Sequence, residues 1–428
     1  MGNGGGRIVA VMSIQIHWRQ ATNFQAMTKV IVNPEILRWA RETAGLELEE
    51  AAKKIALGPT KAMARAERLE QLEAGEAAPT RALLVRMANQ YRRPLLTFYL
   101  SEIPKKGDRG NDYRTLPDGY DPADDAFLDA LIRSIRARQS LLRAALEDEE
   151  ETDELAFIGS KTMDNGVQAV VDSIRETVPI TLEEFRVAQN ADEAFKELRK
   201  AVESIGVFVV LAGNLGSYHT AIELRTFRGF ALSDPVAPFV IMNDHDARAA
   251  WSFTLLHELT HLWLGQTGIS GSSDEMAIER FCNDVAGEFL LPANELQQFA
   301  LPNVDDDETI AHAIAAFANE RNISRSMVAY KLYLRQRLQQ DLWQRLSTRF
   351  REEWLEGREK RRERARSQKG GANYYTVRRH RVGDALVHVV QRMMRAGALT
   401  TTKAGTVLGV KPKNVQNLLS IGEASPAA

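Results

Sequence analysis

Residues 253–265 read FTLLHELTHLWLG, and the interpretation of the whole chain starts from this stretch. Its mostly apolar positions predict a buried helix over about residues 246–264. His257 and His261 are four residues apart, so their imidazoles project from one face of that helix, about one turn apart. This separation suits two nitrogen ligands of one tetrahedral Zn²⁺.

Glu258 follows the first of these histidines directly. Zinc lowers the pKa of water to near 7, and a neighbouring carboxylate can take a proton from that water and pass it to a leaving amine. The motif therefore predicts a zinc-dependent peptidase with Glu258 as its catalytic base. The motif has two alternative interpretations. The histidines could be a buried pair that hydrogen-bonds within a core, or they could belong to a metal site without catalysis. With eight histidines in the chain, His-Glu-x-x-His is expected by chance only about 0.01 times.

A catalytic zinc needs a third protein ligand. After the motif the chain passes through a polar turn at residues 265–273, which we expect to border the substrate groove, and then re-enters helix over residues 274–292. Spacing alone does not choose among the carboxylates of this helix, which are Glu275, Glu279, Asp284 and Glu288. Cys282 is the single cysteine, and we expect a small core residue there rather than a softer ligand.

Three short β-like runs precede the motif helix, at residues 206–211, 229–233 and 238–243. Each is rich in Val, Phe, Ile or Leu and is bounded by turn-forming residues. Three strands make a small sheet that needs a helix on one face. The sequence thus predicts a mostly helical α+β protein. Tyr218 and His219 lie between the first two strands and could stabilise an oxyanion, although we expect a surface or core role.

A longer pattern continues from His257-Glu258-x-x-His261 into Glu279-x-x-Cys282-Asn283-x-x-Ala286-x-x-x-Leu290-Leu291-Pro292. This pattern resembles the ImmA/IrrE family of zinc peptidases. The resemblance implies a central zincin-like domain, in which a small three-stranded sheet packs on the His-Glu-x-x-His helix. It also implies that zinc is held by His257, His261 and Glu279, because the glutamate before Asn-x-x-Ala is the third ligand in that family. Asn283 then looks like a helix-packing residue that contacts a metal ligand. The implied substrate is a partner protein, a transcriptional repressor.

Residues 30–100 read as a run of short helices. Asn33 can cap the first, the second covers about 48–56 and the third about 61–74, and Pro79-Thr80 opens a fourth. Such a helix-turn-helix bundle can place one helix in a DNA groove while its neighbour braces it. The candidate DNA-binding residues on the third helix are Lys61, Arg65 and Arg68. The alternative is solvated surface charge, because the glutamates of that helix would repel phosphate.

Leu37-Arg38-x-Ala40-Arg41, Leu72-Glu73-Ala74-Gly75-Glu76 and Tyr91-x-x-Pro94-Leu95 resemble an Xre-type helix-turn-helix domain. Residues 58–66 look like extra residues relative to that pattern, and they lengthen or displace the reading helix. The pairing of an Xre-type domain with an ImmA/IrrE peptidase recurs in bacteria and phages. The resemblance implies a transcription regulator in a stress, phage or mobile-element response, with DNA as a partner and a possible homodimer. The competing hypothesis is a DNA-binding repressor or antitoxin whose zinc site is structural or sensory.

The composition limits the remaining options. A formal net charge of −2 over 428 residues means that DNA contact would need a local basic patch. A single cysteine excludes an intrachain disulfide, and no stretch has the length of a transmembrane helix, so we expect a cytoplasmic protein without membrane contact.

The predicted organisation has six parts. They are a flexible leader (1–26), an Xre-type domain (27–100), a linker (101–125), a zinc metallopeptidase domain (126–300), a helical extension (301–369) and a small C-terminal helical unit (370–428). Within the last part, residues 404–419 faintly resemble a second helix-turn-helix, with docking on the peptidase core as the alternative.

Overall fold

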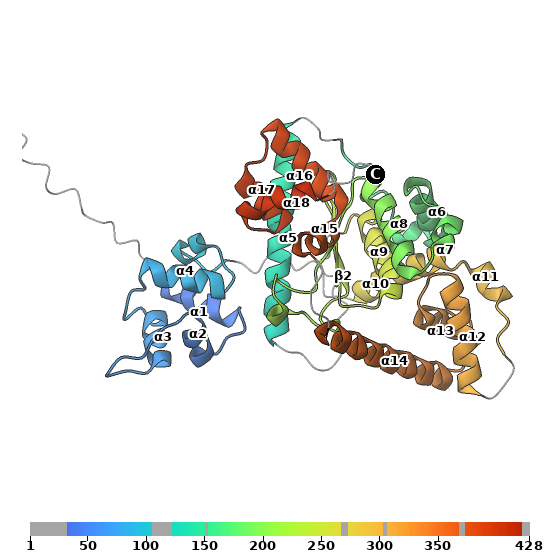
Figure 1. Cartoon of the computed structure of the whole chain (residues 1–428), viewed down its shortest axis with the longest axis horizontal. Coiled ribbons are helices and arrows are strands. Elements are labelled where there is room, and N and C mark those ends of the chain that lie inside the picture. The colour runs from blue at the N-terminus through green and yellow to red at the C-terminus, as the bar shows by residue number, and fades with distance from the viewer. Residues whose placement is uncertain are drawn as a thin grey trace, which may run out of the picture. The chain divides into compact units, whose positions relative to one another are not determined.

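The computed structural model of the chain divides into two compact units, Met1–Pro104 and Lys105–Ala428, each described here by itself. It describes residues 32–104, 122–149, 153–266, 273–302, 306–367 and 373–421. The predicted leader lies outside these residues, as does most of the predicted linker. Helices dominate both units, and one three-stranded sheet lies in the second, as the α+β prediction requires (Figure 1).

The first unit is a bundle of short helices around its own apolar core. Two predicted helix starts are confirmed, because Asn33 Oδ1 accepts the Glu35 N–H at 3.0 Å and Thr80 Oγ1 accepts the Leu83 N–H at 3.2 Å. The elements are α1 (Pro34–Glu42), α2 (Leu48–Lys54), α3 (Arg65–Glu73), α4 (Arg81–Gln90) and the 3₁₀ helix η1 (Leu95–Tyr99).

Helix α3 begins later than the sequence predicted. Its first residue is Arg65, whereas the prediction started it at about residue 61. The preceding residues form a turn closed by the Thr60 N–H, which donates to the Met63 carbonyl at 2.9 Å. Lys61 therefore lies in this turn and does not share a helix with Arg65 and Arg68, which corrects the predicted grouping.

A three-stranded sheet forms the middle layer of the second unit. The predicted strands are confirmed with slightly shorter bounds, as β1 (Phe208–Leu211), β2 (Gly229–Leu232) and β3 (Phe239–Met242). The order is β1-β3-β2, with β1 parallel and β2 antiparallel to β3. Every strand residue is buried, so both faces of the sheet are covered.

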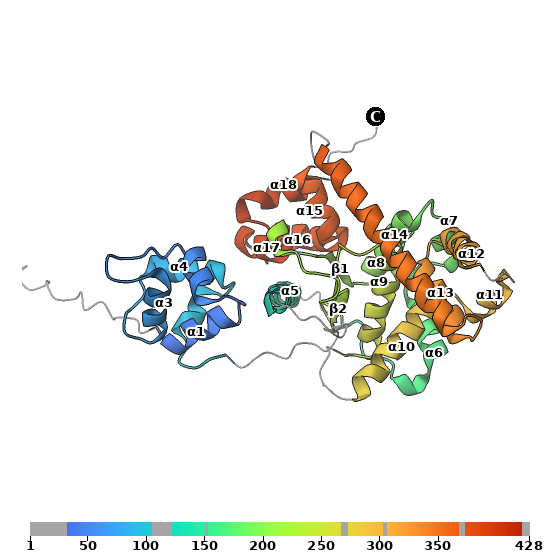
Figure 2. The same cartoon turned by 90° about the horizontal axis from the view of Figure 1, so that it is seen from below.

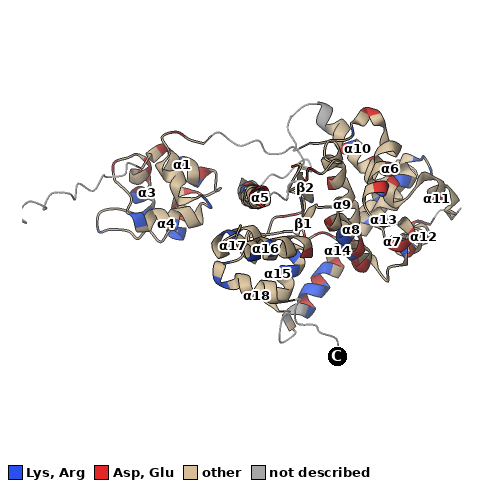
Figure 3. Ribbon diagram, turned by 90° about the horizontal axis from the view of Figure 1, so that it is seen from above, with Lys and Arg blue, Asp and Glu red and all other residues tan. Residues whose placement is uncertain are grey.

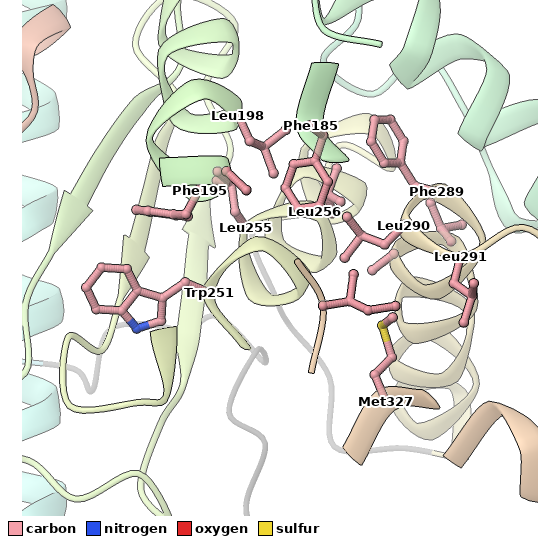
Figure 4. Close-up of a cluster of buried hydrophobic side chains, with 14 of the residues drawn as sticks. Phe185, Phe195, Leu198, Trp251, Leu255, Leu256, Phe289, Leu290, Leu291 and Met327 are labelled. Carbon is pink, nitrogen blue, oxygen red and sulfur yellow. The ribbon is translucent and has the colours of Figure 1, made fainter. Parts of the chain in front are cut away.

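One face of the sheet packs on α8 (Ala191–Ser204) and α9 (Arg248–Trp263), with α10 (Ser273–Leu290) behind them. Val209, Ala231 and Val240 point to this side and share one core with these helices. Figure 4 shows part of that core, including Phe195 and Trp251, whose ring centroids are 5.0 Å apart. The remaining helices associated with this part of the unit are α6 (Val167–Thr177), α7 (Leu182–Val187), α11 (Ala293–Gln298), α12 (Asp307–Glu320), α13 (Arg325–Leu334) and α14 (Gln340–Ser367), together with the 3₁₀ helix η2 (Met163–Asn165). A further 3₁₀ helix, η3 (Tyr218–Thr220), lies between β1 and β2 in the chain.

The opposite face of the sheet is covered by helices from the beginning and the end of the second unit (Figure 2). Phe208, Phe239 and Ile241 point to this side and share a second core with these helices. The C-terminal helices thus dock on the sheet of the second unit, in line with the predicted alternative to a second helix-turn-helix. These elements are α5 (Pro122–Asp148), α15 (Tyr374–Val382), α16 (Asp384–Ala396), α17 (Thr401–Leu408), η4 (Pro412–Asn414) and α18 (Val415–Ser420).

A buried ion pair on α8 ties the C-terminal helices to the sheet. Arg199 Nε lies 2.8 Å from Glu203 Oε1, and the other nitrogens of Arg199 donate to the His380 carbonyl at 2.6 Å and to the Val209 carbonyl. Glu203 Oε2 accepts the Ala385 N–H at 3.2 Å. The Arg199–Glu203 pair of α8 therefore hydrogen-bonds to the backbone of β1, α15 and α16.

The two halves of helix α14 differ in charge and burial. Its C-terminal half is densely charged (Figure 3), whereas Leu346 and Phe350 in its first half belong to the core shared with α9. Among the residues that the structure describes, no helix is both long enough and apolar enough to cross a membrane.

We expect the substitution Glu203→Gln to lower the free energy of unfolding of the second unit by about 3 kcal/mol, because Arg199 stays buried without its carboxylate. Glu197→Gln is the matched control, since Glu197 is exposed on the same helix and such changes stay within about 0.5 kcal/mol. Urea unfolding followed by tryptophan fluorescence measures both. Equal stability of the two variants would show that the ion pair does not hold the C-terminal helices.

Candidate functional site

Helix α9 is buried on all sides at the level of its motif. The exposed fraction is 0% for His257 and Glu258 and 4% for His261. The apolar residues between them pack into the core, and β2, β3, α8 and α10 surround the helix. The sequence therefore places three ionisable side chains where water is largely excluded, which proteins tolerate only when those groups are paired or hold a cation.

Three donor atoms of two helices meet at one point. His257 Nε2 lies 3.2 Å from His261 Nε2, and the Glu279 carboxylate lies 3.3 Å from His257 Nε2 and 3.5 Å from His261 Nε2. A tetrahedral Zn²⁺ with bonds of 2.0–2.1 Å has ligand atoms about 3.3 Å apart. The described residues thus contain a His/His/Glu cluster whose donor set and spacing fit one metal ion.

Asn283 fixes the orientation of the first imidazole. Its Oδ1 lies 3.1 Å from His257 Nδ1, and it comes from α10, one helical turn after Glu279. Because an amide oxygen only accepts, His257 Nδ1 carries the proton and donates, which leaves the Nε2 lone pair facing the cluster. The predicted contact between Asn283 and a candidate ligand is therefore present.

Glu258 lies against the first residue of β2. A Cβ built on Gly229 would come within 2.5 Å of Glu258 Oε1 and 2.9 Å of Thr254 Cγ2, so no other residue fits without a shift. Glycine thus lets the strand backbone approach the carboxylate closely. No function for Gly229 or Thr254 was predicted from the sequence, although a glycine at the start of an apolar strand is a signal of close approach.

Asp284 and Glu288, two of the other carboxylates that spacing left open, are not members of the cluster. Glu288 pairs with Lys331 at 3.1 Å, and burial raises the pKa of Asp284 and lowers the pKa of Lys331. Cys282 is fully buried and is not a member of the cluster found among the described residues. The Glu275 side chain lies outside the part of the chain that the structure describes.

Two further predicted features lie near the sheet. Residues 267–272, most of the turn predicted to border the substrate groove, are outside the described residues. His219 is exposed on η3, and the Tyr218 side chain is likewise outside what the structure describes.

A cavity of about 720 Å³ is lined by residues of α9, α10 and α13, among others. We call it the α13 cavity. Its lining includes Phe253 and Thr254 of α9 and Asn283 of α10, but none of His257, Glu258, His261 and Glu279. Asn283 is the lining residue that contacts His257.

The candidate DNA-binding residues belong to the first unit. Lys61 is exposed, Arg65 pairs with Glu49 at 3.4 Å, and Arg68 donates to the Gly58 carbonyl. Two of the three side chains thus have partners within their own bundle, and the role of all three in DNA contact stays a prediction.

The region that contains the His/His/Glu cluster is similar to a family of peptidases, which suggests a metallopeptidase-like function. Residues 213–333 match the family model of Peptidase M78, described as the IrrE N-terminal-like domain, which supports the resemblance to the ImmA/IrrE family. The matched segment includes β2, β3, α9 and α10, and with them every residue of the cluster. Neither the search of curated proteins nor the search of solved structures found a match.

We expect the purified protein to contain one zinc per chain by elemental analysis. His257→Ala and Glu279→Ala should each lose it, because a site with one ligand missing binds the metal far more weakly. His219→Ala is the control, since it removes an exposed histidine outside the cluster. A wild-type protein that stays metal-free after zinc is added back would rule out the site.

Proposed function

We propose that this chain is a zinc-dependent endopeptidase and transcription regulator that cleaves a partner protein, a transcriptional repressor, in a stress, phage or mobile-element response. The observation that carries the proposal is the meeting of His257, His261 and Glu279 next to the buried Glu258. The match of this region to a peptidase family supports it.

In this proposal His257, His261 and Glu279 hold the metal. Zn²⁺, when bound, supplies Lewis acidity that polarises the scissile carbonyl and makes water a nucleophile at neutral pH. Glu258 takes a proton from the attacking water and delivers it to the leaving amine as the carbon–nitrogen bond breaks. Asn283 keeps the Nε2 lone pair of His257 available, because its Oδ1 accepts a hydrogen bond from the Nδ1–H group.

Burial of Glu258 suits this role. Its side chain is 0% exposed, whereas Glu279 keeps 23% of its side chain exposed. Substrate therefore approaches from the Glu279 side, while the base stays in a region from which bulk water is excluded. Fixed polar groups in such a region act more strongly on developing charge than they would in water.

Glu258→Gln should retain zinc and lose at least about a hundredfold in cleavage rate, because the amide cannot accept the proton. The readout is the set of new protein N-termini that full-length protein produces in a host-cell extract, identified by mass spectrometry. Glu197→Gln provides the same chemical change at an exposed site and should leave the pattern unchanged. Cleavage retained in Glu258→Gln would contradict the assigned role.

We further propose that the first unit binds DNA. The support is its separate compact bundle of short helices, in which Lys61 is exposed beside the start of α3. The alternative function, a repressor or antitoxin whose zinc is structural or sensory, uses the same unit. The two functions differ in whether Glu258 is needed for any effect on the partner protein.

Full-length protein should bind its own promoter fragment with an affinity that falls steeply as salt rises, since phosphate contacts release counterions. Lys61→Ala should reduce the slope of log K against log salt by about one. Lys54→Ala is the control, because Lys54 is paired with Glu50 in the same unit. Absence of binding at low salt would remove the regulator part and leave the peptidase part intact.

A further inference from the structure

A second pocket, of about 360 Å³, lies at the carboxyl ends of the parallel strands β1 and β3. Leu211 ends β1, and Asp244 comes two residues after the end of β3. The start of α9 contributes Arg248 and Trp251. We call it the α15 pocket, because its other lining residues belong to α15. These are Thr376, Val377, His380 and Arg381.

The indole N–H of Trp251 is a buried donor that lacks an acceptor. Trp251 is 1% exposed, and its Nε1 has no hydrogen-bond partner among the residues that the structure describes. Figure 4 shows this nitrogen on the side of the indole away from Phe195. Buried donors in native proteins are almost always paired with protein, water or a ligand, because leaving them unpaired is costly. A molecule in the α15 pocket can supply the acceptor, since Trp251 lines it.

The other polar groups of the lining are also mainly donors. Arg248 and Arg381 contribute guanidinium groups, which only donate, and Thr376 contributes a hydroxyl. Burial lowers the pKa of His380, and the nearby Arg199 and Arg248 lower it further. The His380 imidazole is therefore neutral at pH 7 and offers one N–H group. A ligand that matches this lining is rich in acceptors.

The carboxylate of the lining is already engaged within the protein. Among the described lining residues, Asp244 is the only acidic one. Its Oδ1 accepts the Gly213 N–H at 2.8 Å, and its Oδ2 lies 2.7 Å from Arg381 Nη2. Asp244 therefore neutralises Arg381 and fixes α15 against the end of β3, and Arg248 is the cation that it leaves available.

Arg248 lies over the Trp251 ring at the first residue of α9. Its guanidinium carbon is 3.9 Å from the ring centroid, and its side chain is 53% exposed. Asp192, outside the lining, lies 3.2 Å from Arg248 and also 3.5 Å from Lys196, so its charge is shared between two cations. The N-cap residue Ala247 has no side chain that could cap the helix. Positive charge and the amino end of α9 thus coincide beside Trp251.

We propose that the α15 pocket binds a small anionic molecule, whose phosphate or carboxylate group contacts Arg248 and accepts the indole N–H of Trp251. Anions are favoured at a helix N-terminus, and Leu211 and Val377 offer apolar contacts to the rest of the ligand. The volume of about 360 Å³ falls in the range of roughly 300–1,000 Å³ of ligand pockets. The proposal does not depend on the peptidase function, because no residue of the His/His/Glu cluster lines this pocket.

The test follows the indole N–H resonances of the six tryptophans by NMR in full-length protein labelled with ¹⁵N-tryptophan. Trp251→Phe identifies the resonance of Trp251. Phenyl phosphate, benzoate and the neutral benzamide are titrated at pH 7 and constant ionic strength. The Trp251 resonance should shift saturably with at least one of the two anions and should not respond to benzamide. Tighter binding of phenyl phosphate would identify a phosphate ligand, and tighter binding of benzoate a carboxylate ligand.

Arg248→Gln should weaken the binding of the anion at least about tenfold, because a charge-assisted hydrogen bond is lost. Arg225→Gln is the matched control, since Arg225 is also exposed and paired with a carboxylate, that of Glu223 at 2.9 Å, but does not line the pocket. It should leave the affinity unchanged. The proposal is overturned if neither anion shifts the Trp251 resonance saturably, if benzamide binds as tightly as the anions, or if the two substitutions have equal effects.

Discussion

The constraint on which the second unit depends is that α9 must be buried on all sides while it carries two imidazoles and a carboxylate. Polar groups taken out of water destabilise a fold unless they are compensated. Here His257, His261 and Glu279 point at one another at distances that suit a shared cation. The sheet and α10 fit around this arrangement, with Gly229 leaving room for Glu258 and Asn283 holding the first imidazole.

The features that the sequence predicted correctly are mainly local. His257 and His261 share a face because helix geometry fixes the relation between residues four apart. The caps at Asn33 and Thr80 and the three strands follow from short patterns of the same kind. The choice of Glu279 among four carboxylates required the family resemblance, because spacing within α10 does not say which side of that helix meets α9.

The features that the sequence missed depend on contacts between distant segments. Hydrophobic periodicity indicates that a sheet face is buried, but it does not indicate which segments bury it. Docking of the C-terminal residues was predicted only as an alternative, and the role of α5 in covering the same face was not predicted. The same applies to the α13 cavity, whose walls come from helices far apart in the chain. The start of α3 was misplaced because Lys61 and its neighbours have helical propensity, while the hydrogen bond between Thr60 and Met63 favours a turn.

The double covering of the sheet has a consequence for biosynthesis. α5 leaves the ribosome well before the strands, but α15–α18, which close the same face, are translated long after α9 and α10. A nascent chain thus carries the whole His/His/Glu cluster while Phe208, Phe239 and Ile241 still lack part of their cover, a state in which chaperones and quality-control proteases bind exposed apolar surface. The sheet on which α9 packs is therefore fully covered only after α18 has been translated.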